Sequence, residues 1–437
     1  MNNNVVENGV KMMNYIRSES SRIYQDVVPV ATEDNITTLG NILLDTGYKA
    51  QMNEFINVLV NRIALTIVRN KSYNNPLAIL KKGSAPLGTD IEDIYENPAE
   101  AKPYEYSDSA MAQLLRITDP DTHVAYYRLN RRDKYTKTIT REGLKNAFIS
   151  WENFNKFIDS ITLSLYSGNY ISEFNYTKDL VDGVYNTGKV NVEVVTKPTD
   201  EASAKAFVKK CRFLYSAMSF PSQKYAPYNK MKSDDRNPVT TWTDSDRVVL
   251  LLRSDVLSEI DVEVLAKAFN LNKSDFLGRV IPVDEFKNPE VLGIIADEAF
   301  FQIYDNTFRF DEFYNANVMA WNEYLHAWGT YAVCPFANAV VLATAESKPV
   351  TGLTIDGAPV TLDLNASPNY ETLEITTTPA DATSDINYTS SDEEVMTAEK
   401  VTNKSVKVTP KKTGKATLKA KADNGISAET EVNVVAN

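Results

Sequence analysis

The sequence is poor in the side chain that most often moves protons near neutral pH. Its 437 residues include only two histidines, His123 and His326, and histidine titrates closest to pH 7. His123 follows Asp121 and could pair with it, but no third group at a recognisable spacing completes a catalytic triad. A loop histidine is the simpler interpretation of His123. His326 lies among aromatic residues, and we expect it to pack on the face of a strand.

Sites for phosphate or metal are also poorly supported. Gly83 and Gly88 have the spacing of a phosphate-binding loop, but the lysine that reaches the phosphates is missing, so an ordinary turn is expected. The carboxylates of residues 90–96 lack the order of a calcium loop. Two cysteines, Cys211 and Cys334, are too few for a four-thiolate zinc site or a disulfide framework. We therefore expect no catalytic residue, no cofactor, no metal site and a reducing compartment.

Two clusters of opposite charge are the remaining candidates for a functional surface. The basic cluster is interleaved with tyrosines, as in a nucleic-acid patch, but 58 acidic against 46 basic residues leave a net charge of −12 and disfavour a protein that coats nucleic acid. The clusters could pair across a boundary between subunits or within one hairpin. The candidate contact residues are Asp90, Glu92, Asp93, Arg128, Arg131 and Arg132.

Helical and strand patterns both occur in the first 345 residues. Apolar residues from Leu144 to Leu165 recur every three or four positions, which predicts a long helix over about residues 143–166. Residues 167–169 could kink or end this helix, and a looser apolar pattern at Phe174, Leu180 and Val184 extends toward a stop at residues 187–188. A strand at residues 190–195, a helix capped by Asp200 or Ser203, and a buried strand at residues 248–252 follow. These patterns predict an α+β body.

Two segments of this body differ from the rest, one at its N-terminus and one in its interior. Scattered apolar positions in the first 50 residues indicate an arm that docks on another surface, and segregated charges between residues 74 and 137 indicate an extended loop.

The N-terminus lacks the basic and apolar regions of a signal peptide. The uncharged stretch from residue 324 to 345 is interrupted by His326, Gly329 and Pro335, so it does not match a bilayer-spanning helix. We expect no association with a membrane.

The composition changes near residue 346. The last Trp is Trp328 and the last Phe is Phe336. The remaining residues are rich in Thr, Val and Ala, and residues 405–408 and 416–420 alternate with the period of a half-buried strand. Turn sequences such as Asp356-Gly357 separate the alternating segments. A separate β domain over residues 348–437 is predicted.

A set of short stretches occurs in order across roughly residues 20 to 345. They are Asn74–Leu77, Lys81–Gly83, Pro86–Gly88, Leu144–Trp151, Asp261–Asn270, Ser274–Gly278 and Phe336–Val340. Together they resemble the major capsid protein family of phi-29-like short-tailed phages. The tail separately resembles bacterial immunoglobulin-like (Ig-like) group 2 domains through Thr378–Thr383, Tyr388–Asp392 and Gly414–Thr417, with Tyr388 where that family usually has Trp.

The resemblance implies an α+β tailed-phage capsid fold of the Hong Kong 97 type. In this interpretation residues 1–347 form the capsid body, with an N-terminal arm at about 1–50, an E-loop at about 74–137, a spine helix at about 143–166, and peripheral and axial domains. Residues 348–437 form an all-β Ig-like sandwich.

The implied function is structural rather than enzymatic. The resemblance implies a major capsid protein that assembles in the host cytoplasm, as pentamers and hexamers, into the icosahedral or prolate shell of a virion around double-stranded DNA. Scaffolding and portal proteins are implied partners, and DNA would be touched only weakly, because an acidic subunit repels it. The alternative is a cell-surface or carbohydrate-binding protein that uses the Ig-like tail. The missing signal peptide and carboxylate site disfavour that alternative.

Overall fold

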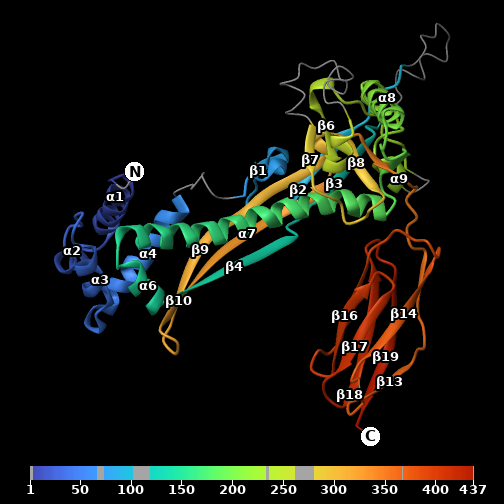
Figure 1. Ribbon diagram of the computed structural model, residues 1–437. Helices are drawn as coiled ribbons and strands as arrows, with labels where there is room; N and C mark the ends of the chain where they lie inside the picture. The colour runs from blue at the N-terminus through green and yellow to red at the C-terminus, as the bar shows by residue number, and fades with distance from the viewer. Residues whose placement is uncertain are drawn as a thin grey trace, which may run out of the picture. The chain divides into compact units, whose positions relative to one another are not determined.

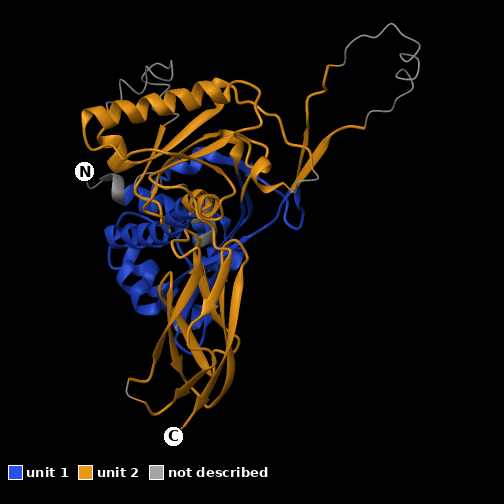
Figure 2. Ribbon diagram, turned by 90° about the vertical axis from the view of Figure 1, so that its right-hand side faces the viewer, with its two compact units in different colours: residues 1–91, 126–176, 302–331 blue, residues 92–125, 177–301, 332–437 orange. Residues whose placement is uncertain are grey.

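The computed structural model describes residues 3–65, 73–101, 119–232, 236–260, 280–366 and 368–436. The chain divides into two compact units (Figure 2). Unit 1 comprises residues 1–91, 126–176 and 302–331, and unit 2 comprises residues 92–125, 177–301 and 332–437. The matched stretches 261–270 and 274–278 lie outside the described residues.

Unit 1 begins with helices whose apolar faces meet in one core. They are α1 (Asn3–Glu19), α2 (Arg22–Val27), α3 (Ile36–Leu44) and α4 (Lys49–Leu65), with the short 3-10 helices η1 (Thr46–Tyr48) and, further along the chain, η2 (Pro76–Leu80). Ile16, Leu39 and Phe55 are fully buried in this core. The Trp151 indole N–H donates to the Glu33 carbonyl at 2.8 Å. The described part of the expected N-terminal arm therefore packs against its own unit.

The long helix of the chain is α7 (Trp151–Asn186; green in Figure 1). Residues 141–147, which the apolar pattern included in part, form the separate helix α6 (Arg141–Ala147), capped by the Thr140 Oγ1 that accepts from the Gly143 N–H at 3.1 Å. The helix does not end near Gly168, which the sequence allowed, but continues to Asn186, next to the predicted stop at residues 187–188. A Cβ at Gly168 would lie 3.3 Å from Cδ1 of Tyr135, so the glycine permits close packing instead of breaking the helix.

Beside α7 in unit 1 lies a four-stranded sheet in the order β1-β9-β10-β4 (Figure 1). Its strands are β1 (Lys81–Ser84), β9 (Phe301–Asn315), β10 (Ala320–Val333) and β4 (Arg131–Thr140). β10 and β4 are antiparallel, with Trp321 opposite Ile139 and Leu325 opposite Tyr135. Strand β4 thus belongs to this sheet, although the sequence placed its first seven residues in a projecting loop.

Unit 2 contains a five-stranded sheet in the order β5-β11-β8-β6-β7. The strands are β5 (Asn191–Val194), β11 (Ala339–Ala343), β8 (Val291–Asp297), β6 (Val248–Arg253) and β7 (Val280–Val283). Helix α8 (Glu201–Met218) starts at a capping box in which Asp200 accepts from the Ser203 N–H, and its buried face packs on the sheet. The expected strands and the capped helix are confirmed. Short helices α9 (Tyr228–Met231), η3 (Ser245–Arg247), α10 (Ser254–Ser258) and η4 (Glu298–Phe300) complete this region.

The tail of unit 2 consists of two four-stranded sheets that share one core. The first has the order β12 (Gly352–Ile355), β14 (Glu371–Thr378), β17 (Ser405–Pro410), β16 (Met396–Thr402), and the second β13 (Val360–Asp363), β19 (Ser427–Val435), β18 (Gly414–Ala422), β15 (Ile386–Ser390). Every residue of their common core lies between Val350 and Val434. Turns at Gly357 and Gly425 adopt positive φ angles of 77° and 95°, which glycine tolerates best.

The helices formed by described residues include none that is long and apolar enough to cross a lipid bilayer.

Candidate contact surfaces

Strands β2 (Ile91–Glu96) and β3 (Thr122–Tyr127) form a two-stranded ribbon with one exposed face. Ile94 and Val124 are exposed on it. Hydrogen bonds from the Tyr95 hydroxyl to the Thr240 carbonyl, at 2.6 Å, and from the Asn97 amide to the Pro238 carbonyl, at 3.0 Å, join the ribbon to residues 238–240 of the same unit. The described part of the expected E-loop is therefore anchored at its base.

The first pair of opposite charges lies where the ribbon begins and ends. The Arg128 Nε donates to Asp90 Oδ2 at 2.8 Å, and both side chains are well exposed. An exposed pair of this kind contributes about 0–1 kcal/mol, because water screens both charges. Pairing within one chain, one of the two alternatives left open by the sequence, thus occurs at these two residues.

The other predicted contact residues fall into different surroundings. Glu92 and Arg132 are exposed, and the guanidinium of Arg132 lies 5.6 Å from the centre of the Trp328 ring. Asp93 is half-buried and accepts from the Cys334 thiol at 3.2 Å. Glu92 and Arg132 thus lie on the surface, whereas Asp93 is half-buried against Cys334 of unit 2.

Arg131 departs most from the expectation of a surface contact, since it is only 4% exposed. Its guanidinium donates to Asp133 at 2.8 Å and to Tyr331 at 2.9 Å. It also donates to Asn169 at 2.8 Å. Burial alone would lower the pKa of Arg131, but Tyr331 and Asp133 outweigh burial and raise it. The residue is a buried hub of unit 1, and its burial removes it from any surface a neighbouring subunit could reach.

Neither histidine lies in a catalytic arrangement. His123 is on strand β3 and not in a loop; it is 8% exposed, its ring centre is 4.7 Å from that of Tyr228, and Nε2 is 3.4 Å from Asp121. His326 lies on β10, half-buried and 3.7 Å from Asp311, which agrees with the expected position on a strand face. Among the described residues, no three His, Cys, Asp or Glu side chains gather closely enough to hold a metal ion.

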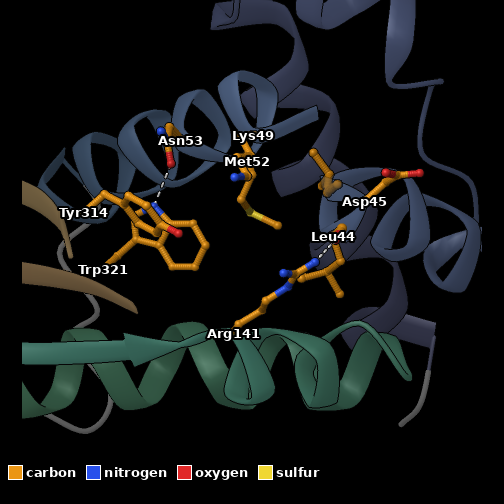
Figure 3. Close-up of a pocket in the computed structure, with 9 residues that line it drawn as sticks. Leu44, Asp45, Lys49, Met52, Asn53, Arg141, Tyr314 and Trp321 are labelled. Atoms are coloured by element: carbon orange, nitrogen blue, oxygen red, sulfur yellow. Dashed lines mark hydrogen bonds between the residues drawn. The ribbon is translucent and has the colours of Figure 1, made fainter. Parts of the chain in front are cut away.

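A cavity of about 80 Å³ lies in unit 1 between α3, α4, α6 and the ends of β9 and β10 (Figure 3). Leu43, Met52 and Trp321 line its apolar part. Two of the polar side chains nearby are engaged: the Trp321 indole N–H donates to Asn53 at 2.9 Å, and Arg141 donates to the Leu44 carbonyl at 2.5 Å. The lining offers neither a paired acid and base nor an activated nucleophile.

One buried group on β10 escaped the sequence analysis. Trp321, Leu325 and Ala327 point to the apolar face of this strand, and Glu323 occupies the same face by period-2 alternation. It is completely buried, and its carboxylate oxygens have no hydrogen-bond partner. A glutamate at an apolar position of an alternating strand was the available signal.

Comparison with known proteins places most of the chain in one group. The model of the family described as Phi29-like phage major capsid protein matches residues 13–343. The major capsid protein of Bacillus phage PZA is 34% identical over 342 residues, which cover 78% of this chain and 74% of that protein. That of Bacillus phage B103 is 34% identical over 339 residues, covering 77% and 73%. The match to the family model ends just before the tail.

The fold is also similar to a solved capsid. A chain of the capsid structure of Staphylococcus phage Andhra superposes with a TM-score of 0.52 at 14% identity, covering 64% of this chain and 87% of that one. At this level of identity the likeness concerns the fold alone, and the fold is that of tailed-phage capsid proteins.

Proposed function

The chain belongs to the Phi29-like phage major capsid protein family, and from this membership we propose how it builds a shell. It is a major capsid protein of a tailed phage, a structural component of the virion and not an enzyme. Its α+β body has the Hong Kong 97-type fold. The alternative of a cell-surface or carbohydrate-binding protein finds no support among these relatives.

Many copies of the chain would form a closed head, as pentamers and hexamers, around double-stranded DNA. The observation that carries this proposal is the family match over residues 13–343, which includes both the long helix and the sheet of unit 1. Scaffolding and portal proteins would direct closure. Packaged DNA would be touched weakly and without sequence preference, because the net charge of −12 opposes its phosphates.

Electron microscopy of the purified chain, with and without its scaffolding protein, tests this proposal. Closed particles of uniform size are expected in at least one of the two samples. Small oligomers of fixed size in both samples would contradict it.

For the charged residues, the proposal is a contact between copies that uses the exposed members of the two clusters. These are Asp90, Glu92, Arg128 and Arg132. The Asp90–Arg128 pair supports the idea that the two clusters are electrostatically matched, and the same groups could exchange partners with a neighbouring copy at little cost, since each pair is screened by water. Arg131 and Asp93 are not part of the proposed contact, because Arg131 is buried and Asp93 is half-buried against Cys334.

For the tail, the proposal is an Ig-like group 2 domain on the outside of the shell. Two observations support this proposal: the motifs of residues 378–383, 388–392 and 414–417 resemble that family, and the core of the tail contains no residue of the body. Tyr388 is half-buried beside this core and donates its hydroxyl to the Asn403 carbonyl at 3.1 Å. An aromatic ring with a polar tip would in this way replace the usual Trp.

A further inference from the structure

Glu323 is the most anomalous charged residue of unit 1. It lies on β10 between Trp321 and Leu325, on the face that packs into the core, and none of its surface is exposed. Neither carboxylate oxygen accepts a hydrogen bond. Native proteins satisfy nearly all buried polar atoms, so a glutamate with both oxygens unsatisfied demands a physical explanation.

The groups around Glu323 come from the neighbouring strands β9 and β4 and from helices α4 and α7. From β9, Glu312 lies near enough to act electrostatically on Glu323. The Oε1 of Glu312 accepts from the Asn57 amide of α4 at 3.2 Å, and its buried Oε2 has no hydrogen-bond partner. From β4, Lys137 is its direct cross-strand neighbour. The apolar stripe of α7 shares this core, and the described side chains of α4 offer amides here, Asn53 and Asn57.

An ionised Glu323 would be unstable in these surroundings. Transfer of an unpaired carboxylate from water to a protein interior is strongly unfavourable, and the second carboxylate at Glu312 adds repulsion. Burial is the main cause, and Glu312 the second, that raise the pKa of Glu323 to about 8. Burial also raises the pKa of Glu312. The protonated form of Glu323 is therefore the one that the observed packing fits.

Lys137 offers a second arrangement for the ionised form. Residues directly opposite on antiparallel strands have Cβ atoms about 4.5–5.5 Å apart, within reach of a lysine and a glutamate. The half-buried Lys137 nevertheless forms no ion pair with either carboxylate in the described structure. A lysine beside an unpartnered carboxyl, without a bond between them, is the arrangement expected while that carboxyl holds a proton.

We propose that Glu323, Glu312 and Lys137 form a proton-dependent latch in the sheet of unit 1. In the closed state Glu323 is neutral and packs in the core, as the structure shows. In the open state Glu323 has lost its proton and moves toward Lys137 to form an ion pair across β10 and β4, which loosens the packing around Trp321 and Leu325. The latch adds a pH-sensitive element to a core that is built mainly from apolar side chains.

The direction of the effect follows from linkage. Glu323 is protonated in the folded chain up to about pH 8, whereas a glutamate in the unfolded chain ionises near pH 4.5. Its contribution to stability is therefore complete below about pH 4.5, falls as the pH rises through the folded-state pKa, and is lost above it. Between these limits the folding equilibrium constant should fall roughly tenfold for each pH unit from this group alone.

The test uses four full-length chains: the wild type, Glu323→Gln, Lys137→Met, and the matched control Glu19→Gln, which changes an exposed glutamate in the same unit. Denaturant unfolding is measured from pH 5 to pH 9.5. The wild type and the control should lose stability together as the pH rises. Between pH 5 and 8 the folding equilibrium constant of the wild type should fall, relative to that of Glu323→Gln, by roughly a factor of ten for each pH unit. Lys137→Met should match the wild type at pH 6 and be less stable at pH 9.

Infrared spectra provide a readout that does not depend on the stability of a variant. The wild type at pH 6.5 should show the C=O band of a buried carboxylic acid, and this band should disappear at pH 9.5. Loss of the band in Glu323→Gln assigns it to Glu323. If that variant fails to fold, a shift of the band in Glu312→Gln assigns it instead. Parallel pH profiles for the wild type and Glu323→Gln, or a wild-type spectrum without the band at pH 6.5, would overturn the proposal.

Discussion

The guanidinium of Arg131 donates a hydrogen bond to the Oδ1 of Asn169 across 2.8 Å, and this bond joins strand β4 to the middle of helix α7. The two residues are 38 positions apart in the sequence, and the sequence indicated other roles for them: Arg131 in a surface contact and Asn169 at a possible kink or end of the helix. Asn169 also donates to Glu173, one turn along the helix, at 2.9 Å. A polar network therefore occupies the point where the sequence allowed the helix to kink or end.

Replacement of Arg131 should strongly destabilise the chain. Arg131→Met leaves the buried Glu173 with one fewer neighbouring cation and removes the guanidinium hydrogen bond to Asp133. Removal of one partner from a buried charged network typically costs about 3–5 kcal/mol. Arg132→Met, the matched control at an exposed neighbour, should change the free energy of unfolding by less than about 1 kcal/mol. Urea unfolding measures both, and equal effects would show that burial of Arg131 is unimportant.

Substitution of Gly40 should distinguish close packing from helix propensity. A Cβ at Gly40 of α3 would overlap Phe148, so Gly40→Ala should cost about 1–3 kcal/mol through overpacking. Gly183 of α7 has no atom within 4 Å of such a Cβ. Gly183→Ala should therefore stabilise the chain by about 0.5–1 kcal/mol through helix propensity. Thermal melts of the two variants should shift in opposite directions, and a shift in the same direction would contradict the packing shown at Gly40.

Removal of the tail should leave the body able to assemble. Truncation after Ser347 deletes all of the tail core but keeps the bond from the Tyr185 hydroxyl to the Ala345 carbonyl at the end of α7. The truncated chain should form particles of the same diameter as the full chain in electron micrographs, and residues 348–437 alone should unfold cooperatively. Failure of the truncated chain to assemble would mean that the tail takes part in the contacts between copies.

Charge reversal tests the proposed contact between copies. Arg128→Glu with Arg132→Glu should block closure of particles while circular dichroism remains that of a folded chain, because both side chains are exposed. A further reversal of Asp90 and Glu92 to Lys in the same chain should partly restore closure. Exposed pairs contribute roughly 0.2–1 kcal/mol each, but the same contact recurs at every equivalent boundary.

The control for charge reversal must alter net charge by the same amount elsewhere. Lys145→Glu with Lys189→Glu does so at two exposed lysines, and this variant should assemble like the wild type. Normal assembly of the arginine double variant at physiological salt would rule out the contact. Failure of the lysine control would instead show that total charge governs closure.

Local sequence patterns were sufficient to predict many of the helices and strands. The period of apolar residues located α7 and α8, the capping sequence at Asp200 marked the start of α8, and alternation located β17 and β18 of the tail. These features depend on residues a few positions apart, so propensity and periodicity determine them. The ordered stretches shared with a capsid family likewise required no coordinates, and the family match confirms that resemblance.

Tertiary structure decided which charges are accessible. Arg131 and Arg132 are adjacent and chemically identical, yet on a strand their side chains point to opposite faces, and only the packing of β4 against α7 determines which face is buried. The same reason applies to Glu323, whose burial follows from the core that covers its face of β10. It also applies to Gly168, where the helix continues and the ring of Tyr135 packs closely against the glycine. Burial is set by contacts between residues far apart in the sequence, and a local pattern does not contain them.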